Sequence, residues 1–223
     1  MTVHRGALAA PLVALVLAAC GEAQPSETPK PPCPTAAPLA AETDAILEGA
    51  EQAVVTTNKG TFPIELYPDE APLATANFVN LARCGFYDNI RFHRVLAGFV
   101  AQAGDPNTDP DRAGSDPSLI GQGFPGYRFE IEPPAENLAY IQYSVSMANG
   151  GRPDTNGSQF FIALDDLQAG MQRTYTIFGQ VVDGTDVVDT IGGVAVNGPA
   201  GLPLDEVVIE TIEITGPPAA SPS

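Results

Sequence analysis

Short segments in which hydrophobic and polar residues alternate recur along this chain, and this is the pattern of β-strands with one buried face. Two of them, residues 51–57 and 61–67, are rich in β-branched residues and flank the turn sequence Asn58-Lys59-Gly60. They predict a β-hairpin. Further segments of this kind cover residues 91–96, 98–102, 127–131, 142–148, 159–164, 176–182 and 206–214. The chain is therefore predicted to form mainly antiparallel β-structure.

Only two segments have helical periodicity. The first begins after Asp69, a candidate N-cap, has Pro72 in its first turn and ends before Gly85, as helices commonly do. The second covers residues 185–191 and is long enough for about two turns. Many short strands with only two helices predict an all-β barrel that is closed at its ends.

Residues 1–19 have the composition of a signal peptide, with His4 and Arg5 before an apolar run that is too short to span a bilayer comfortably. The sequence Leu17-Ala18-Ala19-Cys20 resembles a bacterial lipobox, in which the signal is cut before a cysteine that receives a diacylglyceryl group. The resemblance implies a mature protein that begins at a lipidated Cys20. It would be exported and anchored to a membrane, at the outer face of the cell membrane or on the periplasmic side. An ordinary secretory signal with an incidental cysteine is the alternative.

Residues 20–50 begin at this cysteine, and residues 21–41 are rich in Pro, Ala, Glu and Thr without apolar periodicity; five prolines lie from Pro25 to Pro34. This composition predicts a semi-rigid, disordered spacer between the anchor and the folded part. Residues 216–223 are predicted to be a disordered tail. The remaining residues, 51–215, are enough for one domain with a single core.

The net charge of −17 disfavours nucleic acid and anionic lipid surfaces as partners. We expect a monomer whose acidity serves solubility. If Cys20 is lipidated, Cys33 and Cys84 remain; an exported protein permits a disulfide between them, and two unpaired thiols are the alternative. The cysteine spacing matches no metal-binding pattern, and neither a metal nor another cofactor is predicted.

Two longer motifs carry the clearest functional signal: FHRVLAGFVAQAGD at residues 92–105 and SMANGGRPDTNGSQFFI at residues 146–162. Their order and spacing resemble the cyclophilin family of peptidyl-prolyl cis-trans isomerases over about residues 51–215. The resemblance implies a closed eight-stranded antiparallel β-barrel with a helix covering each mouth. It also implies an enzyme that accelerates X-Pro bond rotation without a cofactor.

Arg94 is the residue to which the resemblance assigns catalysis. Rotation about an X-Pro bond has a barrier of about 18–20 kcal/mol because the planar amide is stabilised by resonance. When the amide twists, the prolyl nitrogen gains a lone pair, so a fixed donor aimed at this atom binds the transition state better than the substrate. An arginine is always charged and presents a planar set of donors. Arg94 also stands in an otherwise apolar segment, which favours this role over that of a surface ion pair.

The resemblance also implies a peptide-binding site around Arg94. Phe99, Val100 and Phe161 match the walls and floor of the proline pocket, although the family most often has methionine at the position of Val100. Gln102 matches a glutamine that binds the substrate backbone and supports the arginine. The other matching positions are Ala148 and Asn149, which contact the peptide backbone, Tyr175 in place of a family histidine, and Leu167 or Met171 in place of a family tryptophan. His93 and Phe160 are expected to point to the opposite face, as a hydrogen-bonded structural histidine and a core residue.

Two other motifs suggest alternatives. Asp105, Asn107, Asp109, Asp111 and Asp116 follow a calcium-loop register, but Pro110 stands where that loop needs glycine, so a solvated acidic insertion is favoured. The sequence GQGFPG at residues 121–126 satisfies a nucleotide-binding pattern but contains a proline and lacks the strand and helix that this pattern needs. The favoured function is isomerisation of X-Pro bonds in exported polypeptides. A non-catalytic chaperone or assembly module of the same fold, which binds proline-containing segments, is the alternative.

Overall fold

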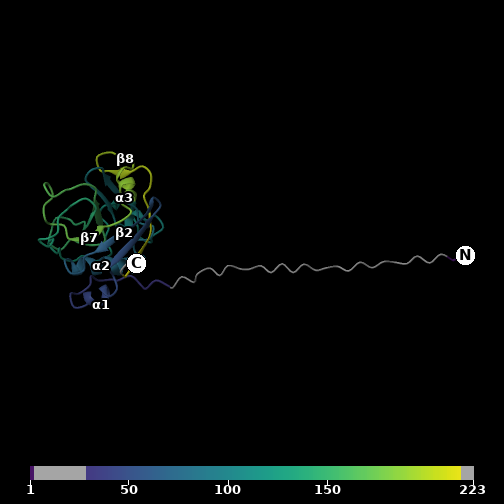
Figure 1. Cartoon of the computed structure of the whole chain (residues 1–223), viewed down its shortest axis with the longest axis horizontal. Coiled ribbons are helices and arrows are strands. Elements are labelled where there is room, and N and C mark those ends of the chain that lie inside the picture. Colours follow the sequence, from purple (N-terminus) through teal and green to yellow (C-terminus); the bar gives the residue numbers. More distant parts are fainter. Residues whose placement is uncertain (3–28, 217–223) are drawn as a thin grey trace, which may run out of the picture.

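The computed structural model of the chain describes residues 1–2 and 29–216 (Figure 1). Residues 3–19 of the predicted signal peptide, Cys20 with its lipobox and almost all of the predicted tail therefore lie outside the described residues. Eight strands form one antiparallel sheet in the order β10-β1-β2-β7-β5-β6-β4-β3. They are β1 (Gln52–Thr57), β2 (Gly60–Leu66), β3 (Arg94–Leu96), β4 (Val100–Ala103), β5 (Ser144–Met147), β6 (Phe160–Ala163), β7 (Ile177–Val181) and β10 (Ile209–Thr215). A separate two-stranded ribbon consists of β8 (Val196–Asn197) and β9 (Leu202–Pro203).

The predicted hairpin is confirmed, since β1 and β2 pair in register from Gln52–Glu65 to Thr57–Gly60. The strand predicted over residues 127–131 is wrong. This segment makes only one isolated bridge, Phe129 to Asn156, and its neighbours belong to a long irregular connection. Alternation at residues 127–131 reflects a single buried Phe129 between exposed positions, and alternation of this kind does not require a sheet partner.

The prediction of a closed barrel is not met, because the sheet curls but its edge strands β3 and β10 do not pair. The segment before β3 does meet the start of β10: Arg91 and Val208 form an isolated bridge, and three backbone hydrogen bonds join residues 89–92 to residues 207–209. The outer side of the three-residue β3 is occupied by the loop of the β8–β9 ribbon instead, where the amide of Val95 donates to the carbonyl of Gly201 at 2.7 Å. A side chain at Gly201 would meet the carbonyl oxygen of Val95 at 2.4 Å, so this close approach requires glycine.

Both predicted helices are present, as α2 (Pro72–Arg83) and α3 (Thr185–Gly192). Figure 1 shows them at opposite ends of the curled sheet. Asp69 does not cap α2: the N-cap residue makes no side-chain hydrogen bond, and the carboxylate of Glu132 accepts from the amides of Leu73 and Ala74 at 2.9 and 2.7 Å. Two short 3₁₀-helices, Pro106–Thr108 and Pro117–Leu119, lie in the acidic loop.

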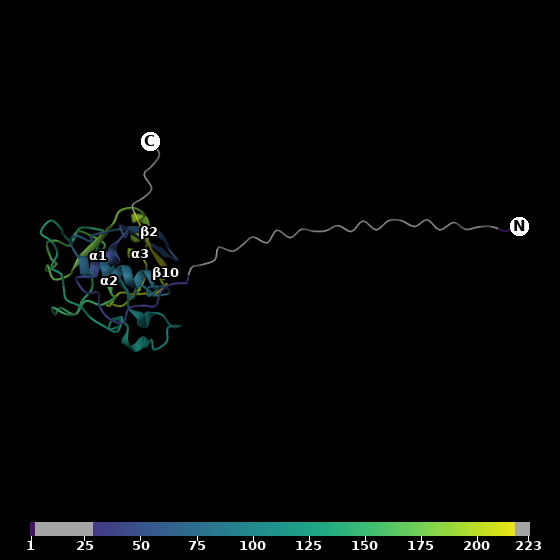
Figure 2. The same ribbon diagram turned by 90° about the horizontal axis from the view of Figure 1, so that it is seen from below.

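A third α-helix, α1 (Thr43–Leu47), was not predicted and falls inside the predicted spacer. It lies beside α2 in Figures 1 and 2, where Ile46 and Leu47 pack against the core. Cys33 forms a disulfide with Cys84 at the end of α2, so of the two alternatives left open by the sequence the structure has the disulfide. The part of the predicted spacer from Cys33 onward therefore lies against the folded domain.

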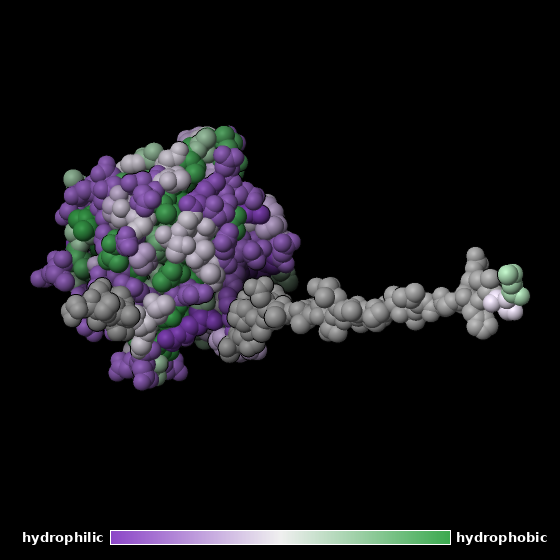
Figure 3. All heavy atoms as spheres, turned by 45° about the vertical axis from the view of Figure 1, so that its right-hand side comes forward, coloured by the Kyte–Doolittle hydropathy of each residue, from purple (hydrophilic) through white to green (hydrophobic). Residues whose placement is uncertain are grey.

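The main core fills the inside of the curled sheet and is rich in aromatic residues. Phe78 of α2 contacts Phe160 of β6 edge to face, with ring centroids 5.6 Å apart, and both are fully buried. The inward position predicted for Phe160 is thus confirmed. On the face shown in Figure 3, hydrophobic residues form separate areas among hydrophilic ones. Among residues 1–2 and 29–216, no helix has the length and hydrophobicity needed to cross a membrane.

Candidate active site

Arg94, Gln102 and Phe161 form one row across three neighbouring strands. Arg94 of β3 is the cross-strand partner of Gln102 of β4, and Gln102 is the partner of Phe161 of β6. Residues that are directly opposite each other in an antiparallel ladder project their side chains from the same face. The register therefore brings together three residues that are separated by up to 67 positions in the sequence, on the face opposite to that of Phe160.

The polar part of this row is a chain of hydrogen bonds. Nη1 of Arg94 donates to Oε1 of Gln102 at 3.5 Å, and Nε2 of Gln102 donates to Oε1 of Gln159 at 2.8 Å. Gln159 in turn donates to the carbonyl oxygen of Gly123 at 2.9 Å. The bond of Arg94 is long and so orients its guanidinium only loosely, whereas Gln102 is held firmly by Gln159.

The guanidinium of Arg94 is half-buried and its charge is not balanced by an ion pair. Its central carbon lies 5.6 Å from the centroid of the Phe99 ring, a distance at which a cation is attracted to the ring face. Within the described part of the chain, the ion pairs are made by Lys30, Arg91 and Arg112, and not by Arg94. A donor in this state is available to a ligand.

A small apolar cluster, separate from the main core, lies beside Arg94 and Gln102. Its buried members include the predicted Val100, Phe161 and Leu167, and the predicted Ala148, Met171 and Tyr175 pack against it partly buried. Six of the predicted pocket residues are thus brought together although they come from four segments of the chain. The cluster also contains Tyr67, Leu138, Tyr140, Ala163 and Ile177.

Phe99 and Asn149 lie at the edge of this cluster and not in it. The side chain of Phe99 is 36% exposed and covers the guanidinium of Arg94. The side-chain Nδ2 of Asn149 donates to the carbonyl of Thr174 at 2.9 Å, and its Oδ1 accepts from the backbone amide of Gly151. Both polar atoms of this side chain therefore already have partners within the protein. Only the main chain of Asn149 is then free to meet a ligand.

Tyr140 is a site residue that sequence reasoning missed. Its hydroxyl donates to the carbonyl of Tyr175 at 2.8 Å and accepts from the amide of the same residue at 3.0 Å. This fixes Tyr175, whose ring meets Phe161 edge to face at 5.5 Å. Burial raises the pKa of Tyr140, which keeps its hydroxyl protonated as a donor. Tyr140 lies in an irregular segment with no periodicity, so no pattern in the sequence pointed to it.

His93 is buried next to the start of β3, and the predicted hydrogen bond of its imidazole is not formed at normal geometry. Neither Nδ1 nor Nε2 has a partner among the described residues, although Asp105 and Gln159 are close. Burial lowers the pKa of His93 below its usual value, and the nearby charge of Asp105 opposes this effect. His93 is therefore held in its neutral form near pH 7.

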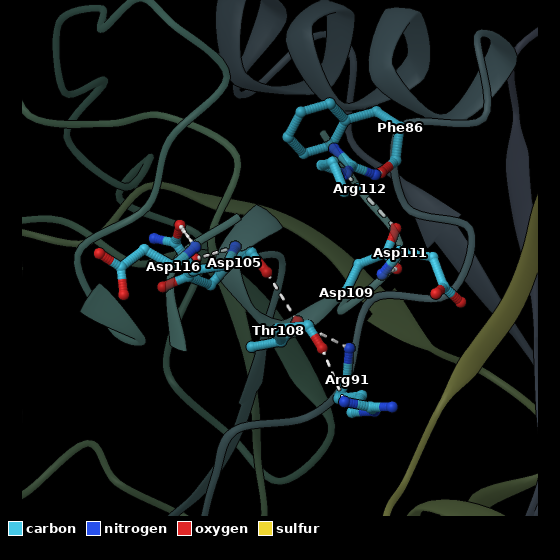
Figure 4. Close-up of polar contacts among 9 residues, drawn as sticks. Phe86, Arg91, Asp105, Thr108, Asp109, Asp111, Arg112 and Asp116 are labelled. Atoms are coloured by element: carbon cyan, nitrogen blue, oxygen red, sulfur yellow. Dashed lines mark hydrogen bonds and ion pairs between the residues drawn. The ribbon is translucent and has the colours of Figure 1, made fainter. Parts of the chain in front are cut away.

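The acidic residues of the predicted calcium register do not converge on one point. In Figure 4, Asp105 and Asp116 lie apart from Asp109 and Asp111. The fully buried Asp105 accepts from the backbone amides of Asn107 and Gly123, and Asp109 pairs with Arg112 at 3.5 Å. Among the residues that the structure describes, no group of three or more His, Cys, Asp or Glu side chains could hold a metal ion. These carboxylates instead organise the loop itself.

Comparison with known proteins identifies the family. Residues 53–214 match the family model described as cyclophilin type peptidyl-prolyl cis-trans isomerase/CLD. A peptidyl-prolyl cis-trans isomerase of Helicobacter pylori is 41% identical over 141 residues, 62% of this chain and 78% of that protein. A Staphylococcus aureus relative is 34% identical over 196 residues, 76% of this chain and 94% of its own length. The match to a Streptococcus pyogenes relative, 37% identical over 188 residues, spans 38% of that longer protein.

A solved structure of similar fold supports the same assignment. The crystal structure of a cyclophilin type peptidyl-prolyl cis-trans isomerase from Cryptosporidium parvum superposes with a TM-score of 0.65 at 32% sequence identity, covering 76% of this chain and 99% of that one. The resemblance of the two sequence motifs is thereby confirmed. This chain belongs to the cyclophilin family, and the enzyme is a cyclophilin-type peptidyl-prolyl cis-trans isomerase.

Proposed function

We propose that Arg94 is the catalytic residue and that it donates a hydrogen bond to the prolyl nitrogen as the X-Pro amide twists. The observation that carries this proposal is a half-buried guanidinium that makes no ion pair with the described residues and lies beside an apolar cluster. The nitrogen has no available lone pair in the planar amide and gains one on twisting. A donor fixed at this place therefore favours the transition state over either planar isomer.

The apolar cluster would hold the proline ring. Phe161 and Val100 would form part of its walls and floor, Leu167 or Met171 the wall for which the family has tryptophan, and Tyr175 would take the place of the family histidine. Apolar side chains favour a proline ring because its burial removes apolar surface from water, at roughly 25 cal/mol per Å². Anchoring the ring here while Arg94 faces its nitrogen leaves the acyl part of the amide free to rotate.

The remaining predicted residues would place the peptide backbone. Gln102 would bind a backbone group of the substrate while it orients Arg94, and its bond to Gln159 supports a fixed position. Ala148 and Asn149 would make main-chain contacts, since the Asn149 side chain is already engaged. Phe99 would cover the guanidinium and reduce its exposure to water.

We further propose that the enzyme is an exported, monomeric lipoprotein that acts on exported polypeptides. The composition of residues 1–19 and the lipobox that ends at Cys20 support export and anchoring. The Cys33–Cys84 disulfide supports the same view independently, because disulfides persist mainly in oxidising compartments outside the cytosol.

The test is an NMR exchange assay of cis/trans conversion in a short X-Pro peptide. Wild type should accelerate the exchange, and Arg94→Ala and Arg94→Lys should both lose most of the acceleration while keeping the wild-type unfolding midpoint within a few degrees. Arg152→Ala, which removes an exposed arginine outside the site, is the control. A folded Arg94→Ala variant with full turnover would overturn the mechanism. If wild type binds the peptide without accelerating exchange, the alternative of a non-catalytic binding module holds instead.

A further inference from the structure

A cleft of about 820 Å³ opens next to the proposed proline pocket. Its walls come from the segments around residues 106–128 and 148–159, and Gln102, Ala148 and Gln159 are shared with the candidate active site. The cleft is therefore continuous with the polar end of the row that starts at Arg94. A peptide residue adds up to about 3.3–3.6 Å of chain, so a side chain within a few positions of a bound proline can reach the cleft.

The charged residues that line this cleft are all basic. Arg112 and Arg128 are its only charged lining residues in the described part of the chain, and no Asp or Glu side chain lines it. The whole protein has 27 acidic and only 10 basic residues. The side chains that line the cleft are thus basic on a protein that is acidic as a whole. The nearest carboxylates are the buried Asp105, which accepts from the amides of Gly121 and Gly123 behind the lining, and Asp109, which pairs with Arg112.

The two arginines differ in how far a nearby carboxylate neutralises their charge. Arg112 lies over the ring of Phe86 (Figure 4), with 4.5 Å from its central carbon to the ring centroid, and pairs with Asp109 at 3.5 Å. Its charge is therefore partly balanced. Arg128 lies over the ring of Phe124 at 4.2 Å, and its only polar contact in the described residues is a 3.4 Å hydrogen bond to the carbonyl of Thr155.

Arg128 thus presents a guanidinium that is ordered but not neutralised. Stacking on an aromatic ring limits the conformations of an arginine and leaves the edges of its planar fork free. Such a fork matches the two oxygens of a carboxylate. On an acidic protein, long-range attraction alone would favour basic peptides, so a preference for an acidic peptide has to come from this local charge.

We propose that Arg128 selects substrates that carry Asp or Glu within a few residues of the isomerised proline. The proposal rests on the proposed function, since it requires the proline to bind beside Gln102. Arg128 would act as a specificity residue: its guanidinium binds the carboxylate of the peptide in the cleft, while Arg94 acts on the prolyl nitrogen. Arg112 adds a weaker contribution because Asp109 partly balances its charge.

The experiment compares Glu with its neutral isostere Gln in otherwise identical X-Pro peptides. One pair carries the variable residue two positions before proline and the other pair two positions after it. For each protein the ratio of kcat/KM for the Glu peptide to that for the Gln peptide is measured at low and high salt. The ratio, rather than the activity, is the readout, because it is independent of any change that a substitution of Arg128 causes in overall turnover.

In wild type, one of the two pairs should show a ratio of about two to five, as expected for an exposed ion pair, and 0.5 M salt should reduce it. Arg128→Gln should bring the ratio to about one and Arg128→Glu below one. Arg152→Gln makes the same charge change at an exposed arginine outside the cleft and should keep the wild-type ratio. A wild-type ratio of one or less for both pairs, or a raised ratio that survives in Arg128→Gln, overturns the proposal.

Failure of the proposed function would be seen separately. If the Gln peptides are isomerised in an Arg94-dependent manner while the ratio stays at one, only the role of Arg128 is wrong. If wild type isomerises no peptide, peptide affinity from NMR chemical-shift titration gives the same Glu-to-Gln comparison. Tighter binding of Glu peptides that is lost in Arg128→Gln would then still support the acidic specificity of the cleft, and equal binding would exclude it.

Discussion

Arg94 and Gln102 face each other across β3 and β4, and their side chains are joined by a 3.5 Å hydrogen bond. The bond is long, but Gln102 is itself fixed by a 2.8 Å bond to Gln159. The position of the guanidinium therefore depends on a relay of two amides, which connects the candidate active site to the floor of the neighbouring cleft at Gly123.

Removing this relay should lower activity with little loss of stability. Gln102→Ala removes the acceptor of Arg94 and the proposed contact to the substrate backbone, and an ordinary hydrogen bond contributes about 0.5–1.5 kcal/mol. We expect kcat/KM to fall by about two- to tenfold. Gln142→Ala is the matched control, because Gln142 is exposed and its amide bonds only to Leu164. Equal activity of Gln102→Ala and wild type would show that Arg94 needs no support from the amide.

Neighbouring residues of β6 should separate activity from stability. Phe161 lies in the apolar cluster and Ile162 in the main core on the opposite face. Phe161→Ala should abolish most peptide affinity, and it should also cost about 3–5 kcal/mol of stability, so its activity is compared at a temperature where it stays folded. Ile162→Val should cost about 0.5–1.5 kcal/mol and leave kcat/KM unchanged. Peptide affinity of folded Phe161→Ala equal to that of wild type would place the proline pocket elsewhere.

His93 should make the protein less stable in acid. Its pKa is lowered in the folded state by burial, with Arg94 acting in the same direction and Asp105 in the opposite one. The unfolded state therefore binds the proton more tightly. The contribution of neutral His93 to the free energy of unfolding is therefore complete above the pKa of histidine in the unfolded chain, near 6.5. It falls as the pH decreases below this value, with a slope of at most about 1.4 kcal/mol per pH unit.

Denaturant unfolding between pH 7.5 and pH 5 checks this prediction. The chain has one other histidine, His4, which lies in the predicted signal peptide. His93→Gln should flatten the dependence on pH over this interval, whatever its effect on stability at pH 7.5. A slope that is the same in His93→Gln and wild type would assign the acid sensitivity to carboxylates.

The Cys33–Cys84 disulfide should stabilise the fold without affecting catalysis. It closes a loop over a sequence separation of 51 and lies at the end of α2, and neither cysteine belongs to the apolar cluster beside Arg94. A Cys33→Ser/Cys84→Ser double variant should lose about 2–4 kcal/mol of unfolding free energy, and wild type in reductant should behave like it. Activity at 25 °C should be unchanged in both. An unfolding midpoint that does not respond to reductant would contradict the role of the disulfide.

An intact-mass measurement of the mature protein tests whether Cys20 is lipidated. If Cys20 is acylated, the purified mature protein should begin at this residue, carry the mass of a diacylglyceryl group and partition into detergent, since each buried CH₂ contributes about 0.8 kcal/mol to membrane binding. Cys20→Ser should keep its signal or appear as a soluble exported form with unchanged kcat/KM. A mature N-terminus at another residue, or an unmodified Cys20, would contradict the lipoprotein proposal.

Local patterns determined much of this protein. The alternation at β1 and β2, the periodicity of α2 and α3 and the two motifs around Arg94 and Phe161 are short-range features, and they predicted the hairpin, both helices and the family. Arg94 and Gln102 lie on the two strands of one hairpin, β3–β4. Their pairing therefore depends only on the short turn between them, which is a local feature of the sequence.

Only the tertiary structure decided the features that depend on distant segments. Glu132 caps α2 from 58 positions away, Tyr140 fixes Tyr175 from an irregular loop, and Gly201 takes the edge of β3 that a closed barrel would give to β10. The helix α1 is short and forms against α2 rather than by its own periodicity. In each case a backbone group or an apolar face is satisfied by whichever partner the fold brings near, and a pattern along the chain contains no information about that partner.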